Sequence, residues 1–146
     1  MIEIGTYSTC DKESVIALVL HCQNDGTRPL VGVEDQSDLL HIEEEYIYNG
    51  GNFWVAKENG KVAGTIGLMN KGNGLCILKK FFVYEPYRGK PHNLGQQLYG
   101  VFLEFAKLHG FSRIILDTPK NTDRAHLFYE KAGFRRIEKE ELPVEY

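Results

Sequence analysis

Residues 79–98 constrain the fold more than any other part of the chain. Their first half, residues 79–84, is rich in aromatic and β-branched side chains and predicts a buried strand. Pro86 ends that strand, because proline cannot donate a hydrogen bond to a β-ladder. A short basic loop containing Gly89 follows. Apolar residues then recur at the three- and four-residue spacing of one helix face, namely Leu94, Leu98, Val101, Phe102, Phe105 and Leu108.

This order of strand, loop and helix predicts a site for an anion. The first backbone N–H groups of a helix have no acceptor within the helix, and the helix dipole is positive at that end. Arg88 and Lys90 add full positive charges beside it. Asn93 followed by Gln96 is typical of a capping residue and its partner three positions on. The alternative interpretation is an ordinary turn between a strand and a helix.

Length and composition favour one globular domain over residues 1–146. The 146 residues are 42% hydrophobic and 25% charged, which is typical of a soluble protein with one sizeable core. No apolar run is long enough to predict a membrane span, and the N-terminus does not resemble a secretion signal. Cys10, Cys22 and Cys76 lack the spacing of metal ligands and are predicted to be reduced. We therefore expect a cytoplasmic protein without a metal site or a membrane partner.

Charge is distributed unevenly along the chain. Residues 1–50 carry a net charge of −8, and the remaining residues carry +5. A basic half around a predicted anion site and an acidic half elsewhere favour an anionic cofactor and a cationic substrate, although solvated helix faces would give the same asymmetry. Nucleic acid is not an expected partner, because the basic residues are scattered and the isoelectric point is about 6.0.

The first half of the chain predicts a strand and two helices. Residues 2–8 alternate as in a strand, and Thr9 or Asp11 can cap a helix that ends near Asn24. Residues 25–36 contain glycine and proline and predict a loop. Ser37 or Asp38 then caps a second predicted helix over residues 39–48.

The second half predicts a sheet with two further helices. Three strands are expected over residues 52–58, 61–70 and 75–84, with Asn59-Gly60 as a strong hairpin signal. The helix of the opening stretch ends at Gly110, and residues 111–118 predict a fully buried strand. A helix over residues 121–132 and a strand from 134 to about 141 complete the order β-α-α-β-β-β-α-β-α-β, an α/β fold with a mixed sheet and helices on both faces.

Two segments in this order resemble the GCN5-related N-acetyltransferases, the GNAT family. The first is VYEPYRGK at residues 83–90, placed before a helix that is followed by LDT at residues 116–118. The second is NTDRAHLFYEKAGF at residues 121–134, which is similar to the family's "N…A…FYEKxGF" segment. The resemblance covers nearly the whole chain.

The resemblance implies direct acetyl transfer from acetyl-CoA to a primary amine, with acetyl-CoA as co-substrate. In this family two central parallel strands splay apart, here residues 75–84 and 111–118, and the pantetheine pairs with the backbone of the first. The residues implied to bind acetyl-CoA are Phe81, Phe82, Val83, Arg88, Gly89, Lys90, Asn93, Leu94, Gly95, Gln96, Asn121, Ala125 and Phe128. A backbone N–H of residues 81–83 would meet the oxyanion. Family members often form homodimers, so a homodimer is one implied assembly.

The loop departs from the family's pattern Q/R-x-x-G-x-G/A. Counting back from Gly95, Asn93 takes the place of the first glycine, and Arg88-Gly89 lies two residues earlier than usual. Asparagine tolerates a left-handed φ better than other non-glycine residues do, so the bend can survive. Pro91 removes one N–H that could have met a phosphate.

The resemblance assigns Tyr129 as the catalytic acid that protonates the departing thiolate; the alternative is a packing residue of a helix. The base that deprotonates the amine is left open between a water-mediated route and side chains of the N-terminal half, namely Glu34, Asp35, His41, Glu43, Glu44 and Glu45. The acceptor is expected to be a cationic small-molecule amine. The alternatives are a protein N-terminus or lysine, or a non-catalytic module that binds or senses acyl-CoA.

Overall fold

One mixed sheet runs through the part of the chain that the structure describes. The computed structural model describes residues 2–24 and 32–116. Within them the strands follow the order of the chain, antiparallel up to the fourth and parallel between the last two. They are β1 (Ile2–Thr6), β2 (Asn52–Glu58), β3 (Lys61–Gly72), β4 (Leu75–Val83) and β5 (Arg113–Ile115).

Two Asn-Gly hairpins connect β2, β3 and β4. Asn59 and Gly60 have φ values of 51° and 82°, and Asn73 and Gly74 have values of 55° and 76°. Positive φ at both central residues matches the right-handed twist of the flanking strands, which is why Asn-Gly is favoured there. The predicted strands are confirmed, with β3 two residues longer and β4 one residue shorter than expected.

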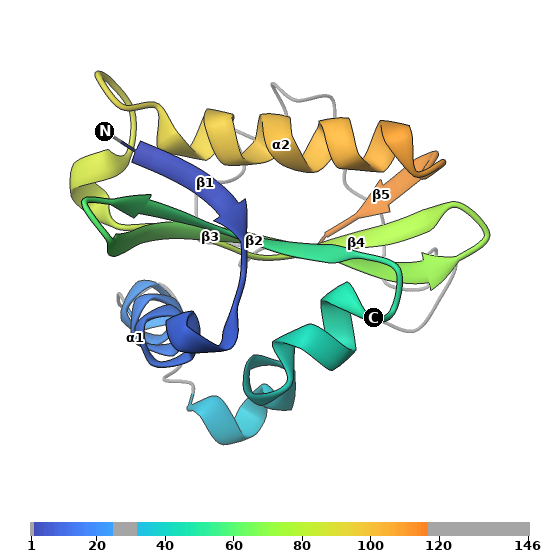
Figure 1. Ribbon diagram of the computed structural model, residues 1–146, viewed down its shortest axis with the longest axis horizontal. Coiled ribbons are helices and arrows are strands. Elements are labelled where there is room, and N and C mark those ends of the chain that lie inside the picture. The colour runs from blue at the N-terminus through green and yellow to red at the C-terminus, as the bar shows by residue number, and fades with distance from the viewer. Residues whose placement is uncertain (1, 25–31, 117–146) are drawn as a thin grey trace.

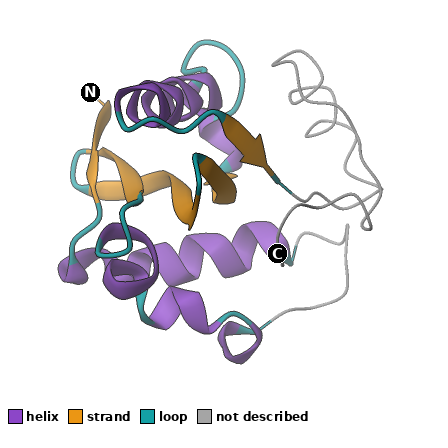
Figure 2. Cartoon of the chain, turned by 90° about the vertical axis from the view of Figure 1, so that its right-hand side faces the viewer, coloured by secondary structure: helices purple, strands orange, loops and turns teal. Residues whose placement is uncertain are grey.

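Helices cover both faces of the sheet (Figures 1 and 2). On one face lies α2 (Leu94–Leu108), and on the other lie α1 (Lys12–Gln23) and the short helical turns of residues 33–47. Side chains of a strand alternate between faces, so Trp54 and Ala56 pack towards α2 while Phe53 and Val55 pack towards α1. The sheet therefore separates two apolar cores, and the mixed α/β fold is confirmed.

The second predicted helix, residues 39–48, is wrong as a single helix. The segment forms a 3-10 turn η3 (Ser37–Leu40), a break at His41 with φ −137°, and a π-helical turn η4 (Glu43–Ile47). Leu39, Ile42 and Tyr46 are buried, and tertiary packing of these three overrides the continuous helix that their spacing indicated. Asp38 is not the cap, because the N-cap of η3 is Gln36 and no side-chain capping bond forms there.

Two buried glutamines join α1 to this segment. Gln23 and Gln36 exchange side-chain amide hydrogen bonds, with Gln23 Nε2 donating to Gln36 Oε1 at 2.9 Å and Gln36 Nε2 donating back to Gln23 Oε1 at 2.5 Å. Both amides are thereby satisfied although they are buried, which a sequence pattern does not reveal.

The remaining elements agree with expectation in position more than in detail. Before α1, residues Thr9–Asp11 form a 3-10 turn, and Asp11, one of the two predicted caps, is the N-cap of α1 without a side-chain capping bond. β5 begins at Arg113 rather than at residue 111 and is not fully buried, since Arg113 is exposed. Residues 117 and 118 of that predicted strand lie outside the described residues. The predicted helix over residues 121–132 and the last strand lie outside the described residues. In the described part, no helix has the length and apolar character needed to cross a membrane.

Candidate active site

The described residues of β5 pair with the beginning of β4. Leu75, Cys76 and Ile77 pair in parallel with Arg113, Ile114 and Ile115. β4 continues to Val83 along its antiparallel partner β3. The splay of the two parallel strands stays a prediction, because residues 117 and 118 of the second strand lie outside the described residues. Phe81, Phe82 and Val83, three predicted acetyl-CoA contacts, lie in the last stretch of β4.

A β-bulge interrupts β4 where that stretch begins. Thr65 of β3 is opposite Phe82 and Gly67 is opposite Lys79, so two residues of β4, Lys80 and Phe81, face one residue of β3. Lys80 has a φ of 54°. This left-handed conformation costs a non-glycine residue about 1–3 kcal/mol and persists only where its surroundings fix it.

Side chains from three other elements fix the bulge. Thr65 is fully buried, and its Oγ1 donates a hydrogen bond to the Lys80 carbonyl at 2.7 Å. The Lys80 ammonium lies 3.6 Å from Asp38 Oδ2 in η3, and the Tyr46 hydroxyl in η4 donates to the same oxygen at 2.6 Å. The two charged side chains are only 11% and 14% exposed. We call Thr65, Asp38, Tyr46 and Lys80 the Asp38 network.

The loop after β4 is anchored to the strand that it leaves. A 3-10 turn η5 (Glu85–Tyr87) follows Val83, and Arg88 Nε donates to the Val83 carbonyl at 2.8 Å. Gly89 has a φ of 64° and accepts a hydrogen bond from the Asn93 N–H at 2.6 Å. Arg88 therefore anchors the loop to β4, besides supplying the positive charge that the sequence predicts. Lys90 is exposed.

Asn93 adopts the left-handed conformation that the sequence analysis allowed it, with φ 48° and ψ 40°. Asn93 is the N-cap of α2, as predicted, but its side chain forms no capping bond. Instead Gln97 Nε2 donates to the His92 carbonyl at 2.7 Å. The left-handed conformation of Asn93 turns the chain sharply into α2. Asn93 therefore makes the bend at the position where the family's loop pattern has its first glycine.

The start of α2 combines a buried anchor with open space. The Leu94 side chain is buried in the core, so only its backbone is available to a ligand. A Cβ built on Gly95 would have one neighbour within 4 Å outside its helix, the ring carbon Phe81 Cζ at 3.7 Å. Gln96 is exposed. The structure therefore brings together ten of the predicted residues along β4, the loop and the first turn of α2, whereas Asn121, Ala125, Phe128 and Tyr129 lie outside the described residues.

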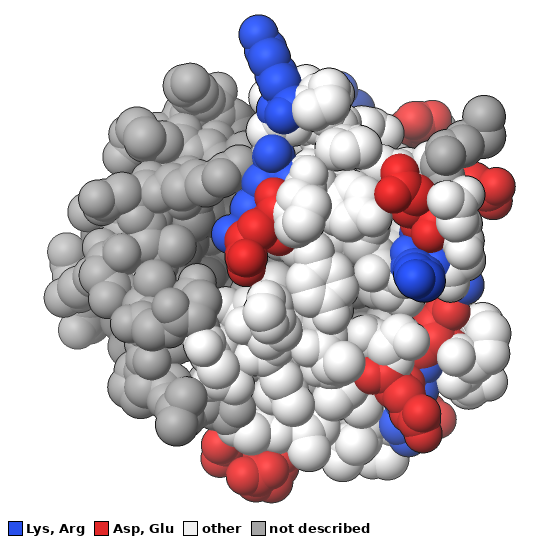
Figure 3. All heavy atoms as spheres, turned by 90° about the vertical axis from the view of Figure 1, so that its left-hand side faces the viewer, with Lys and Arg blue, Asp and Glu red and all other residues white. Residues whose placement is uncertain are grey.

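The acidic segment of the N-terminal half lies on the α1 face of the sheet. Glu34, Asp35, Glu44 and Glu45 are exposed, and Tyr48 donates a hydrogen bond to Glu43 Oε2 at 3.1 Å. Sequence reasoning missed Asp38, the acid of this segment that contacts β4. The Lys79-Lys80 pair within an otherwise apolar strand was the available signal. On the face shown in Figure 3, charged side chains of both signs lie around a largely uncharged centre.

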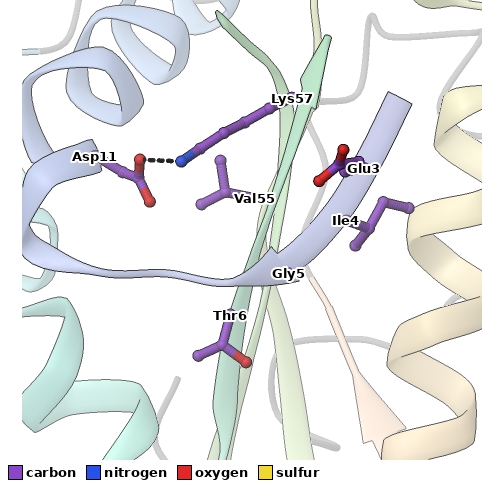
Figure 4. A pocket seen from close by; sticks show the side chains of 7 residues that line it. All are labelled: Glu3, Ile4, Gly5, Thr6, Asp11, Val55 and Lys57. Atoms are coloured by element: carbon purple, nitrogen blue, oxygen red, sulfur yellow. Dashed lines mark ion pairs between the residues drawn. The ribbon is translucent and has the colours of Figure 1, made fainter. Parts of the chain in front are cut away.

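A separate shallow pocket lies at the opposite edge of the sheet, against β1 (Figure 4). Its charged groups already pair with each other, because the Lys57 ammonium is 2.6 Å from Asp11 Oδ1. Glu3, Gly5 and Val55 are among its other lining residues. The pocket is lined by residues of β1 and β2 and by Asp11, and it includes none of the predicted site residues.

Known proteins share this architecture and sequence. A family model described as the acetyltransferase (GNAT) family matches residues 17–134. The crystal structure of an acetyltransferase from Streptococcus agalactiae is 39% identical, with a TM-score of 0.95 over 99% of this chain and 90% of that chain.

Two curated relatives come from Xenopus tropicalis. A probable N-acetyltransferase camello is 32% identical over 74% of this chain, and an N-acetylaspartate synthetase is 35% identical over 70% of this chain. The matches span 50% and 38% of those two relatives, so this chain corresponds to half of their length or less. Since the family model matches most of the chain and the fold agrees with it, this protein belongs to the GNAT acetyltransferase family.

Proposed function

We propose that this protein transfers the acetyl group of acetyl-CoA directly to a primary amine. The observation that carries the proposal is the course of β4, which bulges at Lys80 and leads through an anchored loop to the start of α2. An extended pantetheine can follow such a strand by backbone hydrogen bonding. A pyrophosphate suits the unpaired N–H groups of the first helical turn.

The proposed reaction uses the backbone of β4, the loop after it and the first turn of α2. The nitrogen of the neutral amine attacks the thioester carbonyl carbon, and the carbonyl oxygen gains negative charge. The carbon–sulfur bond then breaks to release CoA, and the nitrogen loses a proton to water or to a side chain of the N-terminal half. A backbone N–H of residues 81–83 is proposed to meet the oxyanion, and Tyr129 is proposed to protonate the leaving thiolate. Gly95 supports the placement of the phosphates, because among the described residues outside its own helix a Cβ there would meet only Phe81 Cζ, at 3.7 Å.

Two classes of acceptor have separate support. Exposed Glu34, Asp35, Glu44 and Glu45 favour a cationic amine, the class that the uneven charge of the sequence predicts. An amine that carries a carboxylate is favoured instead by one relative, which is named for N-acetylaspartate. We propose the cationic small molecule as the acceptor and an amino acid such as aspartate as the second candidate.

Binding is tested first, by thermal unfolding with CoA, ATP or NAD. A ligand at a hundred times its Kd stabilises the folded state by about 2.7 kcal/mol, which raises the Tm by roughly 5–10 °C. We expect that increase with CoA and acetyl-CoA alone. Equal stabilisation by ATP would refute an acyl-CoA site.

Turnover is tested by the release of free CoA thiol in the presence of an amine panel: polyamines, aminoglycosides, aspartate, and a peptide with a free N-terminus and a lysine. The exposed Cys10 thiol requires a no-amine control, or a Cys10→Ser variant. Release that depends on a polyamine or aminoglycoside supports the proposal, and release with aspartate alone supports the second acceptor. CoA binding without release for any amine would identify a non-catalytic acyl-CoA module instead.

A further inference from the structure

The Asp38 network ties the segment that covers the α1 face to the one strained residue of β4. Asp38 belongs to η3 and Tyr46 to η4, while Thr65 belongs to β3, so three elements converge on Lys80. Asp38 Oδ2 receives both the Tyr46 hydroxyl and the Lys80 ammonium, and Thr65 holds the Lys80 carbonyl from the neighbouring strand. Backbone and side chain of Lys80 are therefore restrained independently.

Stability alone is a poor explanation for this arrangement. Charges that are almost fully buried lose much of their hydration, so such a pair is weak evidence for a gain in stability. A well-packed apolar pair at positions 38 and 80 would avoid that cost. The network also maintains an unfavourable φ at Lys80, where a regular strand would not need one. What it specifies is a particular geometry of β4.

That geometry matters because of its position. The bulge lies between the last described pair of β4 with β5, at Ile77, and the predicted contacts at Phe81–Val83. It therefore determines how the backbone of those contacts is directed. A shift of about 1 Å at a reacting centre can lower a rate by about 10²-fold, because catalysis depends on the alignment of the reacting groups.

We propose that Asp38, Tyr46 and Thr65 are positioning residues for acetyl transfer, which act by holding the Lys80 bulge in the conformation that presents the backbone of β4 to the thioester. This inference rests on the proposed function. The three residues contact Lys80 or each other and need not touch either substrate. The negative charge of Asp38 and the hydroxyls of Tyr46 and Thr65 are the groups that matter, rather than the volume of the side chains.

The test uses substitutions that keep shape and remove one group at a time: Asp38→Asn, Thr65→Val and Tyr46→Phe. Two controls match them. Tyr48→Phe removes a hydroxyl that bonds a carboxylate next to η4, and Asp11→Asn breaks the ion pair with Lys57 far from the bulge. For each variant, kcat, both KM values and the folded fraction are measured. The ¹³C shift of Lys80 Cα is also recorded, because it reports the backbone conformation at the bulge.

We expect kcat per folded molecule to fall by roughly 10²-fold in Asp38→Asn, and less in Tyr46→Phe, which retains the ion pair. The KM for the amine should change little, and the Lys80 Cα shift should move in each network variant. Asp11→Asn should lose stability, yet both controls should keep kcat within about twofold of the wild type. Lys80→Arg, which preserves the charge, should retain more activity than Lys80→Met.

Two results would overturn the inference. One is an unchanged kcat per folded molecule in Asp38→Asn and Thr65→Val, and the other is a fall in kcat while the Lys80 shift stays that of the wild type. If Asp38→Asn does not fold, Tyr46→Phe and Thr65→Val decide by the same criteria. If the wild type acetylates no amine, the proposed function fails. In that case, an unchanged Lys80 Cα shift in the variants would separately refute the claim that the Asp38 network fixes the bulge.

Discussion

Gly95→Asp separates the proposed phosphate site from the stability of the fold. Gly95 is the second residue of α2, and a Cβ there would make only an ordinary contact with Phe81 Cζ at 3.7 Å. The side chain can therefore be added without displacing the core. A carboxylate in the first helical turn also interacts favourably with the helix dipole, by about 0.3–1 kcal/mol. We expect the Tm to stay unchanged or to rise slightly.

The effect on the ligand has the opposite sign. Two like charges about 4 Å apart repel by about 1 kcal/mol in water and about 4 kcal/mol at the effective dielectric constant near a protein surface. The half-open space beside Gly95 lies between these limits, so about 2 kcal/mol is a reasonable value. That energy corresponds to a loss of about 30-fold in the affinity for acetyl-CoA. The loss should shrink as salt is added, because the repulsion is screened.

Gly100→Asp is the matched control. Gly100 lies further along the same helix, and a Cβ there has no neighbour within 4 Å outside the helix. The same charge is introduced away from the predicted site, so the affinity should stay near that of the wild type. Calorimetric titration with acetyl-CoA, together with circular dichroism, measures both quantities. A Kd for Gly95→Asp that equals the Kd of Gly100→Asp would refute a phosphate site at this helix start.

Three further predictions concern packing, catalysis and pH. Gly67→Ala should lower the free energy of unfolding in urea by about 1–3 kcal/mol, because its Cβ would lie 2.8 Å from the Tyr46 ring and 2.9 Å from the Phe53 ring. Tyr129→Phe should lower kcat by roughly 10²-fold with little change in acetyl-CoA affinity, as expected for a proton donor to the leaving thiolate; an unchanged kcat with chemistry rate-limiting would leave Tyr129 as a wall of the pocket. Burial raises the pKa of the Cys76 thiol from 9.0 to about 12, so its contribution to stability is complete below pH 9 and is lost as the pH rises towards 12. Urea unfolding should show a decline of up to about 1.4 kcal/mol per pH unit in that interval, and a smaller slope in Cys76→Ala.

The sequence predicted best those features that a few neighbouring residues determine. Asn59-Gly60 fixes its hairpin because both residues accept a positive φ at low cost. The apolar stripe of α2 likewise identified the helix and most of the face that it buries, although Leu108, the last residue of the predicted stripe, is exposed. Gly110 ends that region with a φ of 79°. Asn93 was expected to tolerate a left-handed bend, and it adopts one.

The errors arose where distant residues decide the local structure. Asp38 has the features of a helix cap in the sequence, but its carboxylate is directed to Tyr46 in η4 and to Lys80, which lies far along the chain on β4. The regular second helix is replaced by two short turns, because Leu39, Ile42 and Tyr46 pack into the core. The capping bond expected between Asn93 and Gln96 fails for a related reason, because a left-handed Asn93 does not place its side chain over the first turn.

Lys80 and Asn93 have a left-handed φ outside the hairpins, and both lie in the candidate site. Among the described residues, the non-glycine residues with positive φ are Asn59 and Asn73 in hairpins, Lys80 just before the predicted acetyl-CoA contacts of β4, and Asn93 at the start of α2. Glycine would adopt either of the latter conformations at lower cost. Lys80 instead brings an ammonium group that Asp38 holds, so the side chain restricts a conformation that glycine would leave free. In the proposed reaction β4 presents its backbone to a thioester, and that restriction would favour turnover, because a flexible bulge would spend part of its time misaligned.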